Sequence, residues 1–286
     1  MSELDAAIAR VYGLEIETEP LLPPPDATPE AFLRAALEIG RAIGSRRSTP
    51  PVTAAWEPLP HRAGAPASAE ERTRAVARSL AWAGARGVRW DGLDVRVDAA
   101  GGAAIHAARA LAAGEEILVL PRHAMIVKAD RDELAAWLPL EARDPSSPWR
   151  GYLDAVPPRF DELPVFHDAA DLEALAGTAA HALAVEANRD IRASHARLPP
   201  DVRARVSLAD FAWGRAVLAS RGFHAPGSVE HAIALLPVVD FFNHRPGDTT
   251  WCFDPARGGF VISTERAFAA GEEIGFTYGD RSNARL

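Results

Sequence analysis

Two short motifs near the C-terminal end of the sequence hold the residues best suited to chemistry. The first runs from Pro237 to His244 with the pattern P-x-x-D-x-x-N-H, and it contains Asn243. The second begins at Tyr278, 34 positions after His244, and has the pattern Y-G-x-R-S-N with Arg281. A planar guanidinium can clamp a carboxylate, and a tyrosine hydroxyl can orient a reacting group. The two motifs together predict a site that binds and aligns a small molecule.

A metal site is a weaker interpretation of the same region. His244 with Asp240 and Asp248 leaves the ligand set incomplete, and no second histidine lies four positions from His244. Cys252 is the one cysteine, which excludes an intramolecular disulfide and a Cys-rich zinc site. We therefore expect no metal, and we expect Cys252 to be a buried or bystander thiol beside Trp251 and Phe253.

Each candidate residue also has a simpler structural interpretation. Tyr278 could be a half-buried strand residue, and Asn243-His244 could form a turn with a polar cap. Arg281 could be a surface residue near the chain end, and Arg221 could neutralise the last carbonyls of a helix. Gly101 to Ala103 could be an ordinary β-turn.

The elements that must position these residues alternate between two kinds of pattern. Leu93, Val95 and Val97 alternate with polar residues, which is typical of a strand, and short apolar runs follow at 103–107, 115–120 and 124–127. Short strands return at 231–236, 249–254, 259–264 and 273–278. Between the two sets the spacing is helical. The pattern predicts an α+β fold of short strands split by a helical insertion of roughly 90 residues.

The helices have recognisable starting signals. Thr28-Pro29 predicts a helix over about 29–45, residues 46–67 are a proline-containing linker, and Ser68 predicts an N-cap for a helix over about 69–86. Asp130 opens a helix through Leu138, residues 168–197 form one long Ala-rich helical stretch, and Ser207 or Asp210 opens a helix to Ser220. No βαβ series with a Gly-rich turn is present, which argues against a Rossmann-type site.

The composition limits the choice of partners and compartment. The net charge is −8, with 39 acidic and 31 basic residues, which argues against a nucleic-acid binder and favours a basic peptide or protein partner. No apolar run approaches the roughly 20 residues that span a bilayer, so we expect no membrane association. The acidic N-terminal region has no signal-peptide pattern, so we expect a cytoplasmic protein.

The order of the motifs resembles that of the SET domain. The resemblance is closest to the group of the Rubisco large-subunit lysine methyltransferase, which includes the actin histidine methyltransferase. Besides the two motifs described above, three further blocks match that group in order, and the match runs from about residue 85 to the end. These blocks are Ile105 to Pro121, Ser147 to Leu153, and Phe211 to Phe223.

This resemblance implies a methyltransferase that uses S-adenosylmethionine and acts on a protein side chain, with lysine as the first expected acceptor and histidine as the second. Tyr278 would be the catalytic residue. The expected cofactor-binding residues are Gly101, Gly102, Ala103, Asn243, His244, Tyr278 and Arg281. The expected substrate-binding residues are Arg221, Asp240, Phe223 and Phe241, and the aromatic residues Phe242, Trp251 and Phe276 are further candidates for an acceptor channel.

The sequence departs from the family pattern in three places. The family's G-x-G reads Gly102-Ala103-Ala104, residues 1–85 have no counterpart, and we expect no C-terminal docking domain after Leu286. The predicted organisation is an N-terminal helical extension at 1–85, a first β block at 86–128, a helical insertion at 129–225 and a second β block at 226–286. Two other functions remain open: a non-catalytic SET-like binding module, and a methyltransferase acting on a peptide or small molecule in a biosynthetic pathway.

Overall fold

The computed structural model describes residues 56–64, 66–224 and 232–279. The helix predicted at 29–45 and Arg281 lie outside these residues. Strands occur in two groups: β1 (Leu93–Val97), β2 (Ala103–Ala107), β3 (Glu116–Pro121) and β4 (Ile126–Lys128), then β5 (Gly222–His224), β6 (Ile233–Leu235), β7 (Asn243–His244), β8 (Thr249–Asp254), β9 (Gly259–Thr264) and β10 (Gly275–Phe276). The α-helices are α3 (Ala69–Ala85), α4 (Arg131–Arg143), α5 (Arg150–Leu153), α6 (Ala169–Glu173), α7 (Ala179–Arg197), α8 (Pro200–Arg203) and α9 (Leu208–Arg221).

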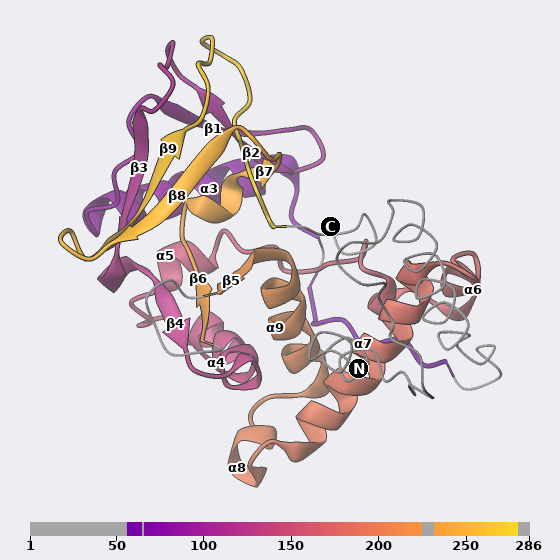
Figure 1. The fold of residues 1–286 in the computed structure, drawn as a ribbon. Coiled ribbons are helices and arrows are strands. Elements are labelled where there is room, and N and C mark those ends of the chain that lie inside the picture. The colour runs from indigo at the N-terminus through magenta and orange to yellow at the C-terminus, as the bar shows by residue number, and fades with distance from the viewer. Residues whose placement is uncertain (1–55, 65, 225–231, 280–286) are drawn as a thin grey trace, which may run out of the picture.

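The strands from the two ends of the described chain combine into shared sheets. One sheet has the order β3-β9-β8, another has the order β4-β6-β5, and β1 pairs with β2 while β7 pairs with β10. Figure 1 shows β1, β2, β3, β8 and β9 gathered at one end of the molecule with α3 beside them, while α4, α7, α8 and α9 occupy the other end. The predicted α+β architecture, with strand blocks on either side of a helical insertion, is confirmed.

Strand β6 lies between two hydrophobic cores. Ala234 and Leu236 belong to a core formed by the β sheets and α3, while Leu235 belongs to a second core formed by helices α4, α5, α7 and α9. Successive side chains of an extended chain point to opposite faces, so this short stretch contributes to both cores. The strand ends shortly before the P-x-x-D-x-x-N-H motif, and the two cores therefore fix where that motif begins.

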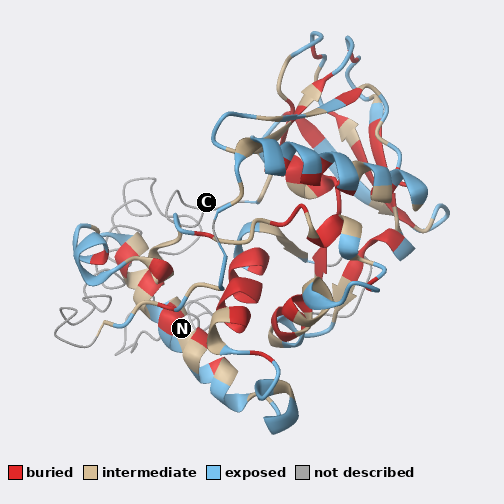
Figure 2. Cartoon of the chain, turned by 180° about the vertical axis from the view of Figure 1, so that it is seen from behind, coloured by how far each residue is buried: buried red, intermediate tan, exposed pale blue. Residues whose placement is uncertain are grey.

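The predicted helix starts at Ser68 and Ser207 are confirmed, and both are capping boxes. The Ser68 hydroxyl accepts from the Glu71 backbone while the Glu71 carboxylate accepts from the Ser68 backbone, and Ser207 and Asp210 are paired in the same way. Each box satisfies two backbone N–H groups that a helix end would otherwise leave unpaired. The two helices differ in burial, as Figure 2 shows: α3 is buried along one side, whereas α9 is buried over most of its length.

Helix α4 continues five residues past its predicted end, through Pro139. Proline has no N–H, so the carbonyl of Ala135, four positions earlier, loses its helical partner. Gly214 of α9 packs directly against this carbonyl, because a Cβ built on Gly214 would lie 2.1 Å from the Ala135 oxygen. The tight approach of α9 supports α4 where the sequence alone predicts a stop.

A second helix prediction was also wrong in extent. The stretch 168–197 is two helices, because the chain breaks between Glu173 and Ala179 at Gly177, whose φ is 79°, and Thr178 caps α7. The described part of the predicted linker packs against the insertion: Leu59 is 1% exposed, and its N–H donates to the Val165 carbonyl.

Each predicted strand overlaps an observed one, but β5 and β7 were not predicted. Both are too short, at three and two residues, to produce an alternating pattern. None of the helices in the described parts of the chain combines the length and the apolar character that crossing a bilayer would require.

Candidate functional site

The two motifs predicted to hold chemistry meet where β7 and β10 pair in parallel. Asn243 lies opposite Gly275, and His244 lies opposite Phe276. A Cβ on Gly275 would lie 2.2 Å from the Cβ of Arg245, so only glycine allows the two segments to approach this closely. The pairing places Asn243 and His244 beside the residues that lead to Tyr278.

A buried carboxylate fixes this pairing. Asp248, which is 2% exposed, accepts hydrogen bonds from the Gly275 backbone at 2.8 Å and from Arg266 Nε at 2.8 Å. The neighbouring Thr249 hydroxyl donates to the Gly275 carbonyl at 2.9 Å. Both backbone groups of Gly275 are therefore bound by the segment after His244. Asp248 is a structural residue in this arrangement.

Tyr278 is held at both its backbone and its side chain. Its backbone N–H donates to Nδ1 of His244 at 3.0 Å, and its hydroxyl donates to the Phe242 carbonyl at 2.6 Å. Because Nδ1 of His244 accepts, the proton of the neutral imidazole is assigned to Nε2. The ring of Tyr278 lies 5.2 Å from the His244 ring. The predicted catalytic tyrosine and the predicted cofactor-binding histidine are thus direct neighbours.

Asn243 is oriented by an acid that the sequence did not single out. Its side-chain amide donates to Oε1 of Glu273 at 2.7 Å, and Arg245 Nη1 donates to the Glu273 carbonyl at 3.1 Å. Glu273 also pairs with His106 of β2 in an isolated bridge. Glu273 therefore connects the first β block to the Asn243-His244 segment.

These residues open onto a cavity of about 570 Å³. A series of aromatic rings forms one side: Trp251 stacks on Phe260 at 5.1 Å, Phe260 lies 6.4 Å from Phe276, and Phe276 meets Phe223 edge-to-face at 5.8 Å. Trp251 is 44% exposed, so the aromatic series runs from the surface into the core. The predicted site residues lining the cavity are Arg221, Phe223, Asp240, Asn243, His244 and Tyr278.

An ion pair lies in the cavity wall. Arg221 Nη1 is 3.2 Å from Oδ2 of Asp240 and 2.9 Å from the Asp240 carbonyl, and the Tyr152 hydroxyl donates to the same Oδ2 at 2.9 Å. Burial raises the pKa of the Asp240 carboxyl above its ordinary value, although Arg221 and Tyr152 act in the opposite direction. Burial, followed by the charge of Asp240, raises the pKa of Tyr152 well above 10.0.

The backbone leading to Asp240 is strained. Val238 has φ of 74°, which is a rare conformation for a β-branched residue and costs on the order of 1–3 kcal/mol. The short 3-10 helix Val239–Phe241 follows, and its geometry directs Asp240 toward Arg221.

The Gly101–Ala103 segment forms the β1–β2 turn and is not among the residues that line the cavity. Gly101 has φ of 87°, and the Asp98 carboxylate accepts from the Gly102 backbone at 2.8 Å. A Cβ on Gly102 would lie 2.8 Å from that carboxylate. The turn itself therefore accounts for both glycines.

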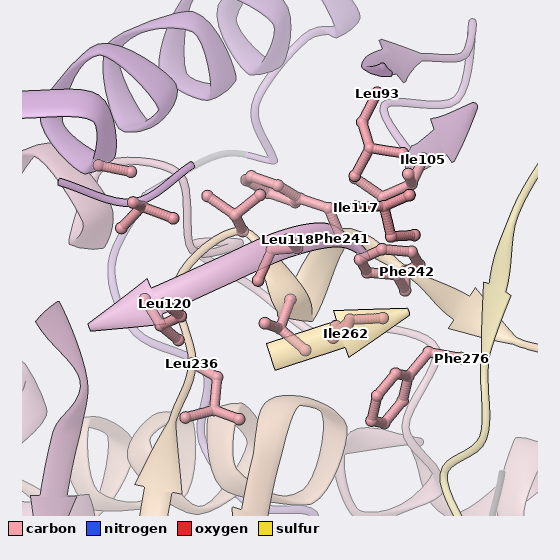
Figure 3. Packing of buried hydrophobic residues seen from close by; sticks show 14 of the residues in the cluster. Leu93, Ile105, Ile117, Leu118, Leu120, Leu236, Phe241, Phe242, Ile262 and Phe276 are labelled. Atoms are coloured by element: carbon pink, nitrogen blue, oxygen red, sulfur yellow. The ribbon is translucent and has the colours of Figure 1, made fainter. Parts of the chain in front are cut away.

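Two aromatic side chains expected at the acceptor do not line the cavity. Phe241, expected at the substrate, is 2% exposed and packs in the first core near Ile117 and Leu118, as Figure 3 shows. Phe242 is 1% exposed and packs in the same core, following the turn at Val238. Cys252, expected to be a buried or bystander thiol, is exposed on β8, which excludes the buried alternative.

Within the described residues, no three His, Cys, Asp or Glu side chains are grouped as a metal site would require. The residues of the weaker metal interpretation are each bound elsewhere: His244 to the backbone of Tyr278, Asp240 to Arg221, and Asp248 to Arg266.

Three residues near the site were missed from the sequence: Arg72, Tyr152 and Glu273. Arg72 had a usable signal, because it lies on the buried face of α3 with Val76 and Ser79, where a charge needs a partner. Tyr152 and Glu273 had none, since their partners lie 88 and 30 positions away.

The described fold is that of a SET domain. The crystal structure of the SET domain of LSMT bound to lysine and AdoHcy matches with a TM-score of 0.62 and 21% identity, over 75% of this chain and 56% of that one. Rubisco LSMT bound to AdoMet matches with a TM-score of 0.60 and 22% identity, over 74% and 55%. At this level of identity the matches establish the fold, and the predicted SET-type fold is confirmed.

In sequence, the chain is similar to protein methyltransferases of the predicted group. It is 25% identical over 265 residues to the actin-histidine N-methyltransferase of Drosophila melanogaster, covering 77% of this chain and 49% of that protein. It is 26% identical over 172 residues to the chloroplastic [fructose-bisphosphate aldolase]-lysine N-methyltransferase of Arabidopsis thaliana, covering 54% and 35%. The match thus spans about half the length of the first relative and about a third of the second. No protein-family model matches it.

Proposed function

We propose that this chain is an S-adenosylmethionine-dependent methyltransferase that methylates a protein side-chain nitrogen, with lysine as the acceptor. The observation that carries the proposal is the β7–β10 pairing, which brings Asn243, His244 and Tyr278 onto one cavity of a SET fold. The named activities of the relatives support the same reaction class.

The cavity suits a cofactor of this size and chemistry. Its volume lies within the ~300–1,000 Å³ typical of small-molecule sites, and its walls combine aromatic rings with a few polar groups. On the acceptor side of the cavity, where Arg221 and Asp240 are expected to bind substrate, Arg221 Nε and Asp240 Oδ1 are buried and have no hydrogen-bond partner among the described residues. Asn243 and His244 would hold the cofactor, and the resemblance adds Arg281 and the Gly101–Ala103 turn. The AdoMet and AdoHcy complexes of the structural relatives are consistent with this.

When bound, S-adenosylmethionine supplies a methyl group already activated on a sulfonium. The contribution of the protein is alignment, because displacement needs the acceptor nitrogen in line with the methyl group. Tyr278 is held by hydrogen bonds to Phe242 and His244, so it provides a fixed hydroxyl where the methyl group would be transferred. Removal from water inside the cavity disfavours a charged ammonium, which lowers the pKa of an entering lysine and promotes its nucleophilic form.

Both lysine and histidine fit the reaction as acceptors, because amine and imidazole nitrogens are both nucleophiles when neutral. Of the two sequence relatives, one is named for histidine and the other for lysine. We propose lysine, in a basic segment of a protein or peptide, because the net charge of −8 favours a cationic partner. We further propose a cytoplasmic location, on the acidic N-terminal region alone.

Radiolabelled S-adenosylmethionine incubated with the purified chain and a cell lysate tests the proposal. We expect a labelled protein, whose modified residue mass spectrometry identifies as methyl-lysine. Methyl-histidine would overturn the acceptor, and a labelled metabolite or short peptide would indicate a biosynthetic role. Cofactor binding without transfer to any species would favour the non-catalytic binding module, and no cofactor binding would contradict the proposed function altogether.

A further inference from the structure

Four buried or half-buried polar residues from separate parts of the chain meet beside the cavity. Tyr152 of α5 and Arg221 of α9 both bind Asp240, as described above. Arg72 of α3 lies close enough for its charge to act on both Arg221 and Asp240. Its Nη1 donates to the Ala155 carbonyl after α5, and its Nε donates to the Gly101 carbonyl at 3.3 Å. The network therefore joins the insertion, the N-terminal helix and the β1–β2 turn.

The charges of this network are not balanced internally. Asp240 is paired with Arg221, the charge of Arg72 acts on the same carboxylate, and the Asp240 side chain is 1% exposed. A buried polar network stabilises a protein when every member is satisfied, and a partly satisfied one is costly. Here Asp240 Oδ1 and Arg221 Nε both lack partners among the described residues, and both residues line the cavity. The unused hydrogen-bonding capacity of the network thus belongs to its two cavity-lining members.

Tyr152 is the network member that holds the Asp240–Arg221 pair in place without lining the cavity. It is 1% exposed, it does not line the cavity, and its hydroxyl donates to the same Asp240 carboxylate oxygen, Oδ2, that Arg221 contacts. With Oδ2 held by Tyr152 and Arg221, the carboxylate cannot rotate freely, so Oδ1 keeps a defined direction. Burial raises the pKa of Tyr152, so its hydroxyl stays protonated and remains a donor.

We propose that Tyr152 is a positioning residue, which holds Asp240 and through it Arg221 in the orientation that receives the methyl acceptor. This rests on the proposed function, in which Asp240 and Arg221 lie on the acceptor side. Tyr152 acts from the helical insertion, so the insertion contributes to acceptor binding without touching the acceptor itself. The residue was not a candidate from the sequence.

The test is Tyr152→Phe, which removes the hydroxyl and keeps the buried ring. The substrate is the protein that wild type labels in the lysate experiment, purified, with S-adenosylmethionine at saturation. We expect KM for this acceptor to rise about tenfold, the loss typical of one hydrogen bond to a charged group, while the cofactor Kd changes less than about threefold.

The pH profile provides a second readout, which a purely structural role would not move. Tyr152 from α5 and Arg221 from α9 contact Asp240, and Arg72 from α3 acts on it through its charge. The hydrogen bond from Tyr152 lowers the Asp240 pKa, so its removal raises that pKa further. The acidic limb of activity should therefore lie at higher pH in Tyr152→Phe than in wild type, measured between about pH 5 and about pH 8.

Leu153→Ala is the matched control, because Leu153 is the next residue of α5 and packs in the second core at 5% exposure. It should reduce stability while keeping the acceptor KM and the pH profile of wild type. An unchanged KM and profile in Tyr152→Phe would overturn the positioning role, as would a loss confined to cofactor affinity or an identical change in Leu153→Ala. Absence of any labelled acceptor with wild type would instead contradict the proposed function and this inference with it.

Discussion

The backbone N–H of Tyr278 donates a hydrogen bond to Nδ1 of His244, 34 positions earlier in the chain, over 3.0 Å. This contact exists because β7 and β10 run parallel and place the two segments in register. It fixes the ring orientation of His244 and the start of the Tyr278 segment at the same time. The two motifs therefore form one site, and a change in either should be measurable in the other.

Tyr278→Phe should lower methyl transfer much more than cofactor affinity. The hydroxyl acts where the methyl group moves, and an interaction made chiefly in the transition state affects turnover when it is lost. We expect a rate decrease on the order of 100-fold with Kd for S-adenosylmethionine nearly unchanged. Single-turnover rates and calorimetric Kd values, measured side by side, check this. Equal rates would remove Tyr278 from the mechanism, and a parallel loss of affinity would make it a binding residue.

Asn243→Ala should weaken cofactor binding by about 1.5–3 kcal/mol while the fold persists, since a hydrogen bond to a charged group is lost. Calorimetry with S-adenosylhomocysteine measures the change. Asn188→Ala is the control. Asn188 is a buried asparagine of α7 in the helical insertion, and its amide donates to the Glu57 carbonyl. If Asn243→Ala binds as tightly as wild type, Asn243 has no direct role at the cofactor.

S-adenosylmethionine should bind equally well in the presence and absence of a chelator. The candidate metal ligands His244, Asp240 and Asp248 are each held by another protein group in the described residues. Calorimetric titrations with and without ethylenediaminetetraacetate provide the comparison. A strict requirement for an added divalent cation would show that a metal belongs to the site.

Gly214→Ala should destabilise the protein by about 3 kcal/mol, because the added Cβ would overlap the Ala135 carbonyl between α9 and α4. Gly84→Ala in α3 is the matched control: its Cβ would meet Trp90 at an ordinary 3.5 Å, and alanine favours a helix by up to about 1 kcal/mol. Urea unfolding gives both values. Similar effects at the two positions would contradict the close packing of α4 against α9.

Asp210→Asn should reduce stability more at neutral pH than in acid. Burial alone would raise the Asp210 pKa, but hydrogen bonds from Ser207 and Arg143 lower it below 3.8. A lowered folded pKa means that this carboxylate stabilises the protein above its unfolded pKa, and that the contribution is lost as pH falls through the folded value. We expect a cost of about 1–2 kcal/mol near neutral pH and a smaller one near pH 3.

Urea unfolding of wild type and Asp210→Asn at both pH values measures this difference. Asp91→Asn, at an exposed aspartate, is the control and should change little at either pH. A constant gap between wild type and Asp210→Asn across the pH range would mean that its charge does not contribute to stability.

The features predicted correctly from the sequence are those that depend on neighbouring residues. Ser68 and Ser207 start helices because their hydroxyls satisfy backbone groups three positions away, and the alternation around Val95 identifies a strand. The motif at Asn243-His244 and the one at Tyr278 were also visible, and the structure brings them together at one cavity. Local hydrogen bonding and side-chain periodicity are encoded over a few residues, so they can be recognised without the fold.

The tertiary structure decided the features that depend on distant partners. Helix α4 continues through Pro139 because Gly214 lets α9 approach the orphaned carbonyl, and Phe241 is buried because the chain turns at Val238. Tyr152 meets Asp240 across 88 positions only once the two hydrophobic cores have packed on either side of β6. The sequence by itself determined where α3 and α9 begin, where most of the strands lie and which side chains could bind and align a ligand. Which of those side chains reach the cavity was decided by packing, because burial and long-range contact depend on every element that surrounds a residue.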